Sequence, residues 1–519
     1  MASSLEKRAV VSSFIFRFPR GQTKPDVALF KRSDKVRTYQ HHLAPISGSI
    51  DRTDKEPLAA AWRELHEETT LTRTALALWR TGKPFSFSDA SVGREWTVHP
   101  FAFRLKSEDD ARAIHTDWEH ESWGWYDPQR VIDEIGGAHG VPRLTDSLRR
   151  VWFEGETGER AGRTLATGLE RLRTDHESGS RELTAIAIRV FGDFIAQSRE
   201  GDDKLDEGWW RGVRMAAWHL IKNGRESMGA ATLSAVLGVL TEMESVLQMQ
   251  TESVEAKWER MLAVIDSQLQ NRSSRATRLQ KSFVEYLQST FLESGQREKL
   301  TVLTTSASST IRDSLLNAYA ALDLDTLELR VLESRPLFEG ATLAACVLSQ
   351  FQFQFQSSPD KHFHVKLYTD ASAAVASEGV DIVLLGADQI SATKGVSNKT
   401  GSLPLALSAK HMSPAVKIAV LSEVEKINGT GGVVRDDHAE DNDPMEIVGT
   451  WKHDGVKGAQ VLKEPGERAT VEVQNTYFEW VPLDIVDAFV CEEGVMSEDD
   501  IRQKSEKLGE LSRRYFGDL

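Results

Sequence analysis

The sequence predicts a mixed α/β protein, and three observations lead to this fold class. Short β-rich segments flank a single helix over residues 8–134, the pattern is helical almost without a break over 181–295, and apolar strands alternate with helices over 296–519. A two-residue period of apolar side chains predicts strands, whereas steps of three and four predict helices. Residues 135–180 are rich in Gly and Arg and are expected to be a linker with one short helix.

The N-terminal region is expected to run in the order strand, strand, helix, strand. Val10–Phe18 and Asp26–Lys31 are β-rich, and Trp96–Leu105 alternates apolar and polar side chains. Pro57–Glu68 is expected to be helical, because proline suits the first helical turn and the apolar residues recur at steps of four and three.

The C-terminal region is expected to contain five strands. They are the segments KLTVLTT, LELRVLE, HFHVKLYT, VDIVLLGAD and VKIAVLSE. Continuous apolar strands between helices predict a parallel sheet with helices on both faces, and ligands on such sheets bind at the carboxyl ends of the strands. Residues 424–470 break the pattern with GTGG and DDHAEDNDP, and are expected to form an acidic surface insertion.

The composition limits the kinds of protein this chain can be. It has 519 residues with 63 basic and 78 acidic side chains, and the net charge of −15 argues against direct nucleic-acid binding. The two cysteines, Cys346 and Cys491, stand in apolar surroundings and are too few for a disulfide framework. We expect Cys346 to be buried. No run of about 18 apolar residues predicts a membrane span, so a cytoplasmic protein is expected.

The predicted helix Pro57–Glu68 carries the sharpest chemical signal. Glu64, Glu67 and Glu68 fall on one face at i, i+3 and i+4. Three crowded carboxylates repel one another, and a hard divalent cation such as Mg²⁺ removes that repulsion and uses their oxygens as ligands. The alternative is a solvated, Glu-rich surface helix without a ligand.

The order of residues in this segment resembles the Nudix box. The resemblance rests on the run Arg63-Glu64-Leu65-His66-Glu67-Glu68 with Gly48 ahead of it. Two departures are visible: Thr70 replaces the last glycine of the box, and Lys55 stands where its first acid is expected. The resemblance implies an α/β/α sandwich over residues 8–134 that hydrolyses a phosphoanhydride bond.

The Nudix resemblance also implies roles for individual residues. Glu67 and Glu68 would be the best ligands of Mg²⁺ or Mn²⁺, with Glu64 supporting them, and all three would be catalytic. Arg63 would orient a glutamate side chain. Glu119 is a weaker candidate for an extra ligand or base, or is simply an exposed acid. The implied substrate is a nucleoside diphosphate linked to another moiety, of the ADP-ribose or nucleotide-sugar type.

Aromatic residues of the same region have two interpretations. Phe85, Trp123 and Trp125 are candidates for stacking on a nucleotide base. Each of them is equally suited to pack in the core.

Four stretches of the C-terminal region stand where a parallel sheet presents a ligand site. They offer Thr305 and Ser306 after the first strand, Arg335 after the second, Asp388 at the end of the fourth, and Asn398 with Lys399 before the next helix. Hydroxyls and free N–H groups at a helix start suit an anion, and lysine or arginine suits a phosphate. Taken singly, such residues are more often helix caps or turn caps.

The joint order of these stretches resembles the family of initiation factor 2B α/β/δ subunits, methylthioribose-1-phosphate isomerases and ribose-1,5-bisphosphate isomerases. The resemblance extends from about Glu182 onward and implies a helical subdomain over 181–295 and a Rossmann-like ligand-binding domain over 296–519. Arg225, in Gly224–Ala230, would bind substrate, and NTYFEWVPLDIVDAFVCEEG would form the closing strand.

Two departures from the isomerases concern the chemistry of this pocket. Asp388 matches the catalytic Asp, but Ser306 stands at the position of the catalytic Cys, and Thr393-Lys394-Gly395 replaces Asn-Gly-Asp. A serine hydroxyl is a far weaker acid than a thiol. The pocket is therefore expected to bind a sugar phosphate or nucleotide, whereas its catalytic role stays open.

Three hypotheses follow for the whole chain. The first is a Nudix hydrolase whose second domain senses or converts the product. The second is a regulatory or scaffold protein that assembles with itself or with initiation-factor subunits, and the third is a sugar-phosphate aldose–ketose isomerase. The resemblance implies a homo-oligomer formed through the C-terminal domain.

Overall fold

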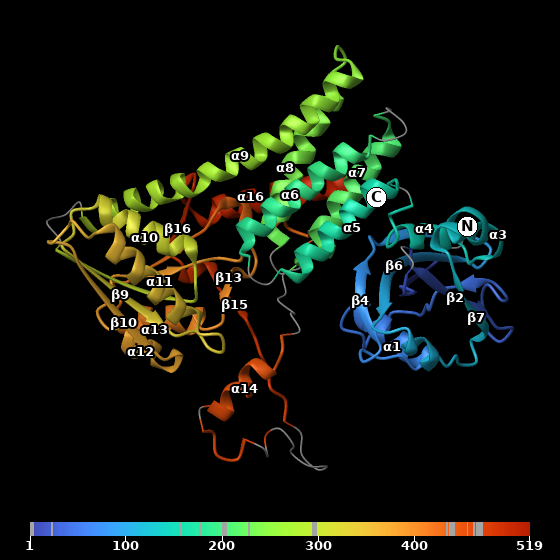
Figure 1. Cartoon of the computed structure of the whole chain (residues 1–519), viewed down its shortest axis with the longest axis horizontal. Helices are drawn as coiled ribbons and strands as arrows, with labels where there is room; N and C mark the ends of the chain where they lie inside the picture. The colour runs from blue at the N-terminus through green and yellow to red at the C-terminus, as the bar shows by residue number, and fades with distance from the viewer. Residues whose placement is uncertain are drawn as a thin grey trace. The chain divides into compact units, whose positions relative to one another are not determined.

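The computed structural model divides into two compact units, and each contains both sheets and helices (Figure 1). The first unit comprises Met1–Thr174, Arg189–Gly224 and Asp518–Leu519, and the second comprises Asp175–Ile188 and Arg225–Gly517. The residues described are 5–21, 24–155, 157–175, 178–199, 205–226, 229–292, 298–431, 434, 442–453, 455–459, 462 and 471–519. The predicted mixed α/β class is confirmed.

The first unit contains a seven-stranded sheet. Its strands are β1 (Glu6–Arg17), β2 (Asp26–Arg32), β3 (Leu43–Ala44), β4 (Leu76–Thr81), β5 (Phe85–Asp89), β6 (Arg94–Leu105) and β7 (His120–Tyr126). The order is β3-β2-β1-β6-β4, with β7 paired to β2 and β5 to β6. β1 and β6 run parallel, and the other pairs are antiparallel.

The two faces of this sheet are buried by different elements. Val11 and Ile15 of β1 face α1 (Pro57–Thr69), whereas Phe14 and Phe16 face the opposite side. This opposite side is covered by Val131, Ile132, Leu144, Leu148, Val151 and Trp152. They come from η2 (Val131–Ile135), from α4 (Leu144–Arg149) and from the residues that follow it. The expected linker thus contributes part of the core of the first unit.

Further helices complete the first unit after the expected linker begins. α5 (Glu159–Thr174) is followed by the second half of α6 (Ser180–Gln197) and by α7 (Glu207–Asn223). The Asn223 side chain binds the last residue of β4. Its Oδ1 accepts from the Thr81 N–H at 2.7 Å, and its Nδ2 donates to the Thr81 carbonyl at 2.9 Å. Helix α7 and strand β4 are therefore joined although they lie far apart in the sequence.

The second unit contains a seven-stranded sheet in the order β10-β9-β8-β11-β14-β16-β17. Its strands are β8 (Lys299–Thr305), β9 (Thr326–Leu332), β10 (His362–Tyr368), β11 (Ile382–Leu385), β14 (Lys417–Leu421), β16 (Ala488–Cys491) and β17 (Gly494–Met496). All neighbours run parallel except β16 and β17. The five predicted strands correspond to β8, β9, β10, β11 and β14.

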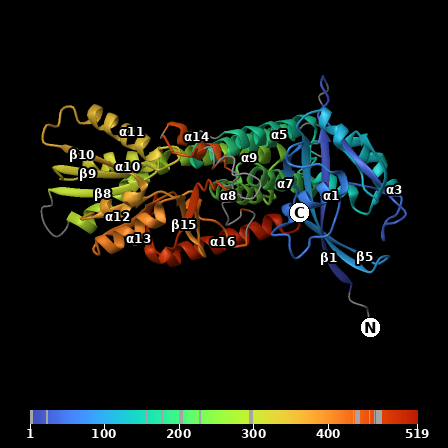
Figure 2. The same cartoon turned by 90° about the horizontal axis from the view of Figure 1, so that it is seen from below.

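Helices cover both faces of this parallel sheet (Figure 2). The helices α9 (Val254–Leu287), α10 (Ser309–Ala321) and α11 (Glu339–Gln354) pack on one face, and α12 (Ala373–Ala376), α13 (Ser402–Met412) and α16 (Glu498–Phe516) pack on the other. The prediction that Cys346 is buried is wrong: it is exposed on α11, because Leu343 and Val347 take the face of the helix that packs on the sheet. Cys491 is buried.

A small antiparallel sheet stands beside the ends of the parallel strands. It pairs β12 (Gln389–Ser391), β13 (Gly395–Lys399) and β15 (Phe478–Val481). The segment between β14 and β15, expected to be a surface insertion, begins with η6 (Val424–Lys426) and the fully buried Ile427. It continues with α14 (Met445–His453), and residues 435–441 of its acidic run lie outside the described residues.

Among the described residues, α8 (Gly229–Leu247) is the one helix with the length and apolar composition of a membrane span. It packs against α9, α16 and η6, and most of its residues are buried in the second unit. A helix that is apolar on all sides is typical of the core of a folded domain.

Candidate functional site

Arg63 donates hydrogen bonds to three carboxylates on and just before α1. Its Nη1 donates to Glu64 Oε1 at 2.7 Å and to Glu67 Oε2 at 3.1 Å, and its Nη2 donates to Asp54 Oδ2 at 2.9 Å. The hydrogen bond from Arg63 lowers the pKa of Asp54 below its ordinary value. Arg63 thus holds the acids in place, as the sequence predicts.

A second acid, Glu68, is the most buried of the predicted metal ligands. It is 3% exposed, and burial raises its pKa well above the ordinary value, with the charges of Glu119, Glu64 and Asp117 raising it further. Burial also raises the pKa of Glu64 and of Glu119. These acids are therefore held close together, where their negative charges repel one another.

This set of oxygen donors fits a hard divalent cation, because a cation removes both the burial cost and the repulsion of the carboxylates. Within the described part of the chain, no three His, Cys, Asp or Glu side chains already stand in metal-holding geometry. The side chain of Glu67 is 55% exposed and is turned toward Arg63. The structure thus groups Glu64 and Glu68 with Glu119, which the sequence ranked as a weaker candidate.

Two residues around the helix explain how the Glu64 side chain is accommodated and how α1 ends. A Cβ on Gly48 would lie 1.9 Å from Cδ of Glu64, so a larger residue there would displace this carboxylate. Thr70, which replaces the last glycine of the Nudix pattern, ends the helix with φ +62° in the left-handed region that favours glycine. The departure therefore keeps the same backbone turn.

A cavity of about 330 Å³ adjoins these acids, and we call it the carboxylate cavity. Its lining includes Arg32, Tyr39, Gly48, Glu64, Phe87, Arg94, Trp96 and Glu119. The Tyr39 hydroxyl donates to Asp89 at 2.9 Å, and burial, together with Asp89, raises the pKa of Tyr39 to about 12. Arg94 lies over the Trp96 ring at 5.2 Å.

The aromatic residues of the carboxylate cavity differ from those singled out in the sequence. Trp123 and Trp125 pack against the core on the α1 side of the sheet, and Phe85 is absent from the lining. Phe87 and Trp96 line the cavity instead. Phe87 of β5 and Trp96 of β6 are cross-strand neighbours, and this pairing follows from the strand register, which alternation along a single strand does not give.

In the second unit, one pocket of about 320 Å³ collects most of the predicted ligand residues at the ends of the parallel strands. We call it the strand-end pocket. It is lined by Arg225, Thr305, Ser306, Asp388, Asn398 and Lys399 among others. Two residues of the predicted loop Gly224–Ala230, Ser227 and Met228, lie outside the described residues.

Hydroxyl and backbone groups form one wall of the strand-end pocket. Ser306 has φ +67°, and its N–H donates to Ser334 Oγ at 2.7 Å. Thr305 is 2% exposed, and its hydroxyl is hydrogen-bonded to the same Ser334 Oγ at 2.9 Å. Ser308 caps α10 by accepting from the Ile311 N–H, and the start of that helix lines the pocket.

The cations of the pocket are held by specific partners. Lys399 is 5% exposed, and its Nζ lies 2.7 Å from Glu339 Oε1 and 4.1 Å from the centre of the Tyr477 ring. Arg225 Nη1 donates to the Asp175 carbonyl at 3.2 Å. Two further cations that the sequence did not single out line the same pocket: Arg181 and Lys426.

Arg335 is the one predicted ligand residue that the structure does not bring to this pocket. Its Nε lies 3.2 Å from Glu333 Oε1, and its guanidinium stands 5.1 Å from the Phe338 ring. The interpretation of Arg335 as a ligand residue of the strand-end pocket is therefore corrected: it follows its strand, but its side chain pairs with a neighbour.

The segment predicted to form the closing strand has a structural role. Glu479 of β15 accepts hydrogen bonds from the N–H groups of Gly401 at 2.5 Å and Leu403 at 3.1 Å. It thereby caps α13, which begins directly after Lys399 and Thr400. The closing segment fixes the start of a helix next to the pocket.

Comparison with known proteins finds two family regions along the chain. The NUDIX domain model matches residues 7–146, and the model of the Initiation factor 2 subunit family matches residues 176–498. The NUDIX match confirms the prediction of a Nudix hydrolase domain.

The curated relatives of this chain include isomerases. Methylthioribose-1-phosphate isomerase of Pseudomonas fluorescens is 30% identical over 180 residues, 34% of this chain and 43% of that protein. The corresponding enzyme of Magnetococcus marinus is 31% identical over 189 residues, 35% of this chain and 46% of that protein. The chain thus spans less than half the length of these curated relatives.

Solved structures similar to parts of the chain include an initiation factor and a hydrolase. Translation initiation factor eIF-2B of Pyrococcus horikoshii is 17% identical with a TM-score of 0.43, covering 65% of this chain and 98% of that chain. An Ap4A hydrolase of C. elegans is 22% identical with a TM-score of 0.23, covering 28% of this chain and 94% of that chain.

Because the family model matches more than half of the residues of this chain, the chain belongs to the Initiation factor 2 subunit family and carries a NUDIX domain ahead of the family region.

Proposed function

We propose that the first unit hydrolyses the phosphoanhydride bond of a nucleoside diphosphate linked to another moiety, with Mg²⁺ or Mn²⁺ held by Glu64, Glu67 and Glu68. The observation that carries this proposal is the grouping of Glu64, Glu68 and Glu119, of which Glu64 and Glu119 line the carboxylate cavity. When bound there, the metal ion would neutralise the acids and polarise a phosphoryl oxygen.

The residues of the cavity supply binding and orientation. Phe87 and Trp96 offer flat apolar faces to a base. Arg94 and Arg32 offer cations to the phosphates, and Arg32 also lowers the pKa of Glu68 and Glu119 through its charge, so it lies near the acids. A nucleotide held by these groups would present its phosphates beside Glu64.

The test is a substrate panel on the full chain with Mg²⁺ or Mn²⁺. It contains ADP-ribose, nucleotide sugars, dinucleoside polyphosphates and nucleoside triphosphates. We expect turnover of a diphosphate-linked substrate into two phosphate monoesters, and none when the metal is chelated. Turnover of triphosphates alone, or of nothing in the panel, would contradict the proposed substrate class.

For the second unit we propose binding of a sugar phosphate or nucleotide in the strand-end pocket. The support is that four cations, Arg225, Lys399, Arg181 and Lys426, line the same pocket as the hydroxyl-rich start of α10, and such groups suit a phosphate. Ser306 favours binding over isomerisation, because a hydroxyl is a poor substitute for a thiol acid.

Arg225→Ala is expected to weaken binding of a pentose phosphate about tenfold or more, since a hydrogen bond to a charged group is lost. Isothermal titration with ribose 5-phosphate measures this change. Arg335→Ala is the matched control, because Arg335 follows a strand of the same sheet but does not line the pocket. Equal affinities of both variants and the wild type would refute the assignment.

A further inference from the structure

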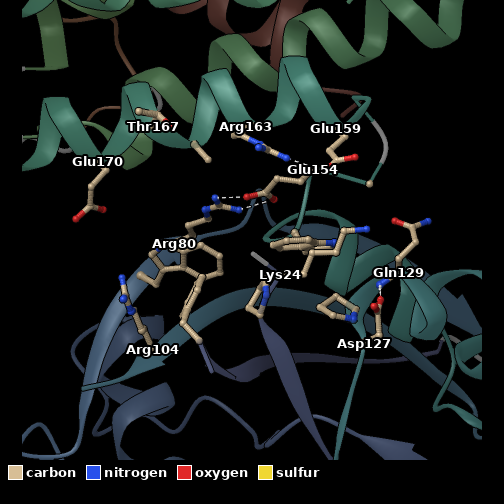
Figure 3. Close-up of a pocket in the computed structure, with 17 residues that line it drawn as sticks. Lys24, Arg80, Arg104, Asp127, Gln129, Glu154, Glu159, Arg163, Thr167 and Glu170 are labelled. Carbon is tan, nitrogen blue, oxygen red and sulfur yellow. Dashed lines mark hydrogen bonds and ion pairs between the residues drawn. The ribbon is translucent and has the colours of Figure 1, made fainter. Parts of the chain in front are cut away.

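A larger cavity in the first unit has no role in the functions proposed above. It has a volume of about 570 Å³, and we call it the sheet–helix cavity because strands and α5 both line it (Figure 3). Phe18, Trp79 and Trp152 form an aromatic wall, whereas Ala166 and Thr167 of α5 lie on the helix side. A volume of this size suits a small organic ligand.

A β-bulge shapes the wall of this cavity. The register of β4 against β6 shifts between Leu78 and Arg80. Side chains of consecutive strand residues normally point to opposite faces, but Trp79 and Arg80 both line the cavity. The bulge therefore turns two neighbouring side chains toward one space, as bulges beside functional sites commonly do.

Arg80 is a fixed part of this wall. It is 3% exposed and forms a two-pronged ion pair with Glu154, with Nη1–Oε2 at 2.8 Å and Nη2–Oε1 at 2.5 Å (Figure 3). Its Nη1 also donates to the Val151 carbonyl at 2.9 Å, and its guanidinium lies 3.9 Å from the centre of the Trp79 ring. Because these contacts already neutralise its charge and hold its side chain in place, Arg80 is a structural part of the cavity wall and is not available to bind an anion.

The acids around the cavity have partners as well. Arg163 pairs with Glu159 at 2.6 Å, Glu170 pairs with Arg173 at 2.5 Å, and Asp127 accepts from the Gln129 N–H at 2.8 Å. These acids therefore do not neutralise the two cations on the strand side of the cavity.

Lys24 and Arg104 are those two cations (Figure 3). Across the described ranges, neither has a carboxylate within ion-pair distance. Arg104 lies over the Phe18 ring at 4.4 Å, which leaves its N–H groups available. Two available cations suit an anionic group, and the aromatic wall beside them suits a flat ring. Together they fit a ligand in which an anionic group is joined to a flat ring.

We infer that the sheet–helix cavity binds a nucleoside phosphate, with its base against Trp79 and Trp152 and its phosphate on Arg104 and Lys24. The cavity is separate from the carboxylate cavity. Arg94 and Arg104 stand at opposite ends of β6, roughly 30 Å apart at about 3.3 Å per residue. One nucleotide cannot reach both, and the inference does not depend on hydrolysis.

The test is photolabelling of the full chain with 2-azidoadenosine 5′-monophosphate, mapped by mass spectrometry. We expect labelled residues around Trp79, Trp152 or Thr167, with AMP competing. In Arg104→Ala the concentration of AMP needed to compete should rise about tenfold or more, because a charged contact is lost. Arg94→Ala is the matched control, since Arg94 is the other arginine of β6 that lies over an aromatic ring, and it should leave this labelling unchanged.

A second variant tests the space instead of the charge. Thr167→Trp fills the cavity from the helix side and should abolish labelling, while circular dichroism checks that the variant folds. Labelling of these residues at the wild-type level in both Arg104→Ala and Thr167→Trp would overturn the inference. Equal labelling by 2-azidoadenosine without its phosphate would overturn the role of Lys24 and Arg104, and no labelling near the cavity would overturn the site.

Discussion

Glu68→Gln is expected to abolish hydrolysis of the diphosphate-linked substrate while making the metal-free protein more stable. Loss of a group one layer away from a metal costs about 10–100-fold, so loss of a ligand should cost at least about a hundredfold. The gain in stability follows from burial: Glu68 is 3% exposed and stands among other acids. Glutamine keeps the shape and removes the charge.

The pH dependence of this gain has a definite sign. Burial raises the pKa of Glu68 above its ordinary value of 4.5, so the unfolded chain releases the proton first as the pH rises. The stability that the protonated group contributes is present below pH 4.5 and is lost as the pH rises through the folded-state pKa. Glutamine does not titrate. The difference in melting temperature between Glu68→Gln and wild type should therefore widen as the pH rises above 4.5.

The measurements for this variant are hydrolysis rates and melting temperatures with and without Mg²⁺. The cation should raise the melting temperature of the wild type and leave that of Glu68→Gln unchanged. Glu134→Gln is the control, because Glu134 is an exposed acid paired with Arg130 at 2.9 Å. A Glu68→Gln protein with wild-type turnover would remove Glu68 from the catalytic machinery.

Glu425→Gln is expected to destabilise the second unit by about 3–5 kcal/mol, the usual cost of breaking a buried ion pair on one side. The side chain of Glu425 is 4% exposed and accepts from both Arg272 and Arg275 of α9. Arg272 is itself 6% exposed. Without the carboxylate, its guanidinium stays buried with an uncompensated charge.

The free energy of unfolding in urea measures this loss. Glu285→Gln is the control on α9, the helix that carries Arg272, because Glu285 forms an exposed pair with Lys281 at 3.7 Å that contributes about 0.3–0.5 kcal/mol. The double variant Glu425→Leu with Arg272→Met should recover part of the loss, since it removes both buried charges. If Glu425→Gln unfolds at the same urea concentration as Glu285→Gln, the pair is not a determinant of stability.

Strongly periodic segments of this fold could be predicted from the sequence alone. The helix expected at Pro57–Glu68 is observed as Pro57–Thr69, and five parallel strands were identified from their continuous apolar runs. The small sheet of β12, β13 and β15 could not be found in this way. Its strands are short, and the pairing of Asn398 with Glu479 joins distant parts of the chain.

The candidate sites show the same limit. Residue types and their positions after strands located the strand-end pocket, because parallel strands place their carboxyl ends together. Side-chain direction was not accessible in this way, as the pairing of Arg335 with Glu333 shows. The lining of the carboxylate cavity by Phe87 and Trp96 depends on cross-strand register, and the grouping of Glu119 with Glu68 depends on how a loop folds back.

The contact between Thr81 and Asn223 has a consequence for synthesis on the ribosome. The two residues are separated by 142 positions in the chain. At about 5–20 residues per second, Asn223 is made roughly 7–30 s after Thr81. During that interval β4 is an edge strand of the nascent sheet that still lacks this partner. Unprotected edges invite pairing with other chains, so the growing protein is exposed to such pairing during this interval.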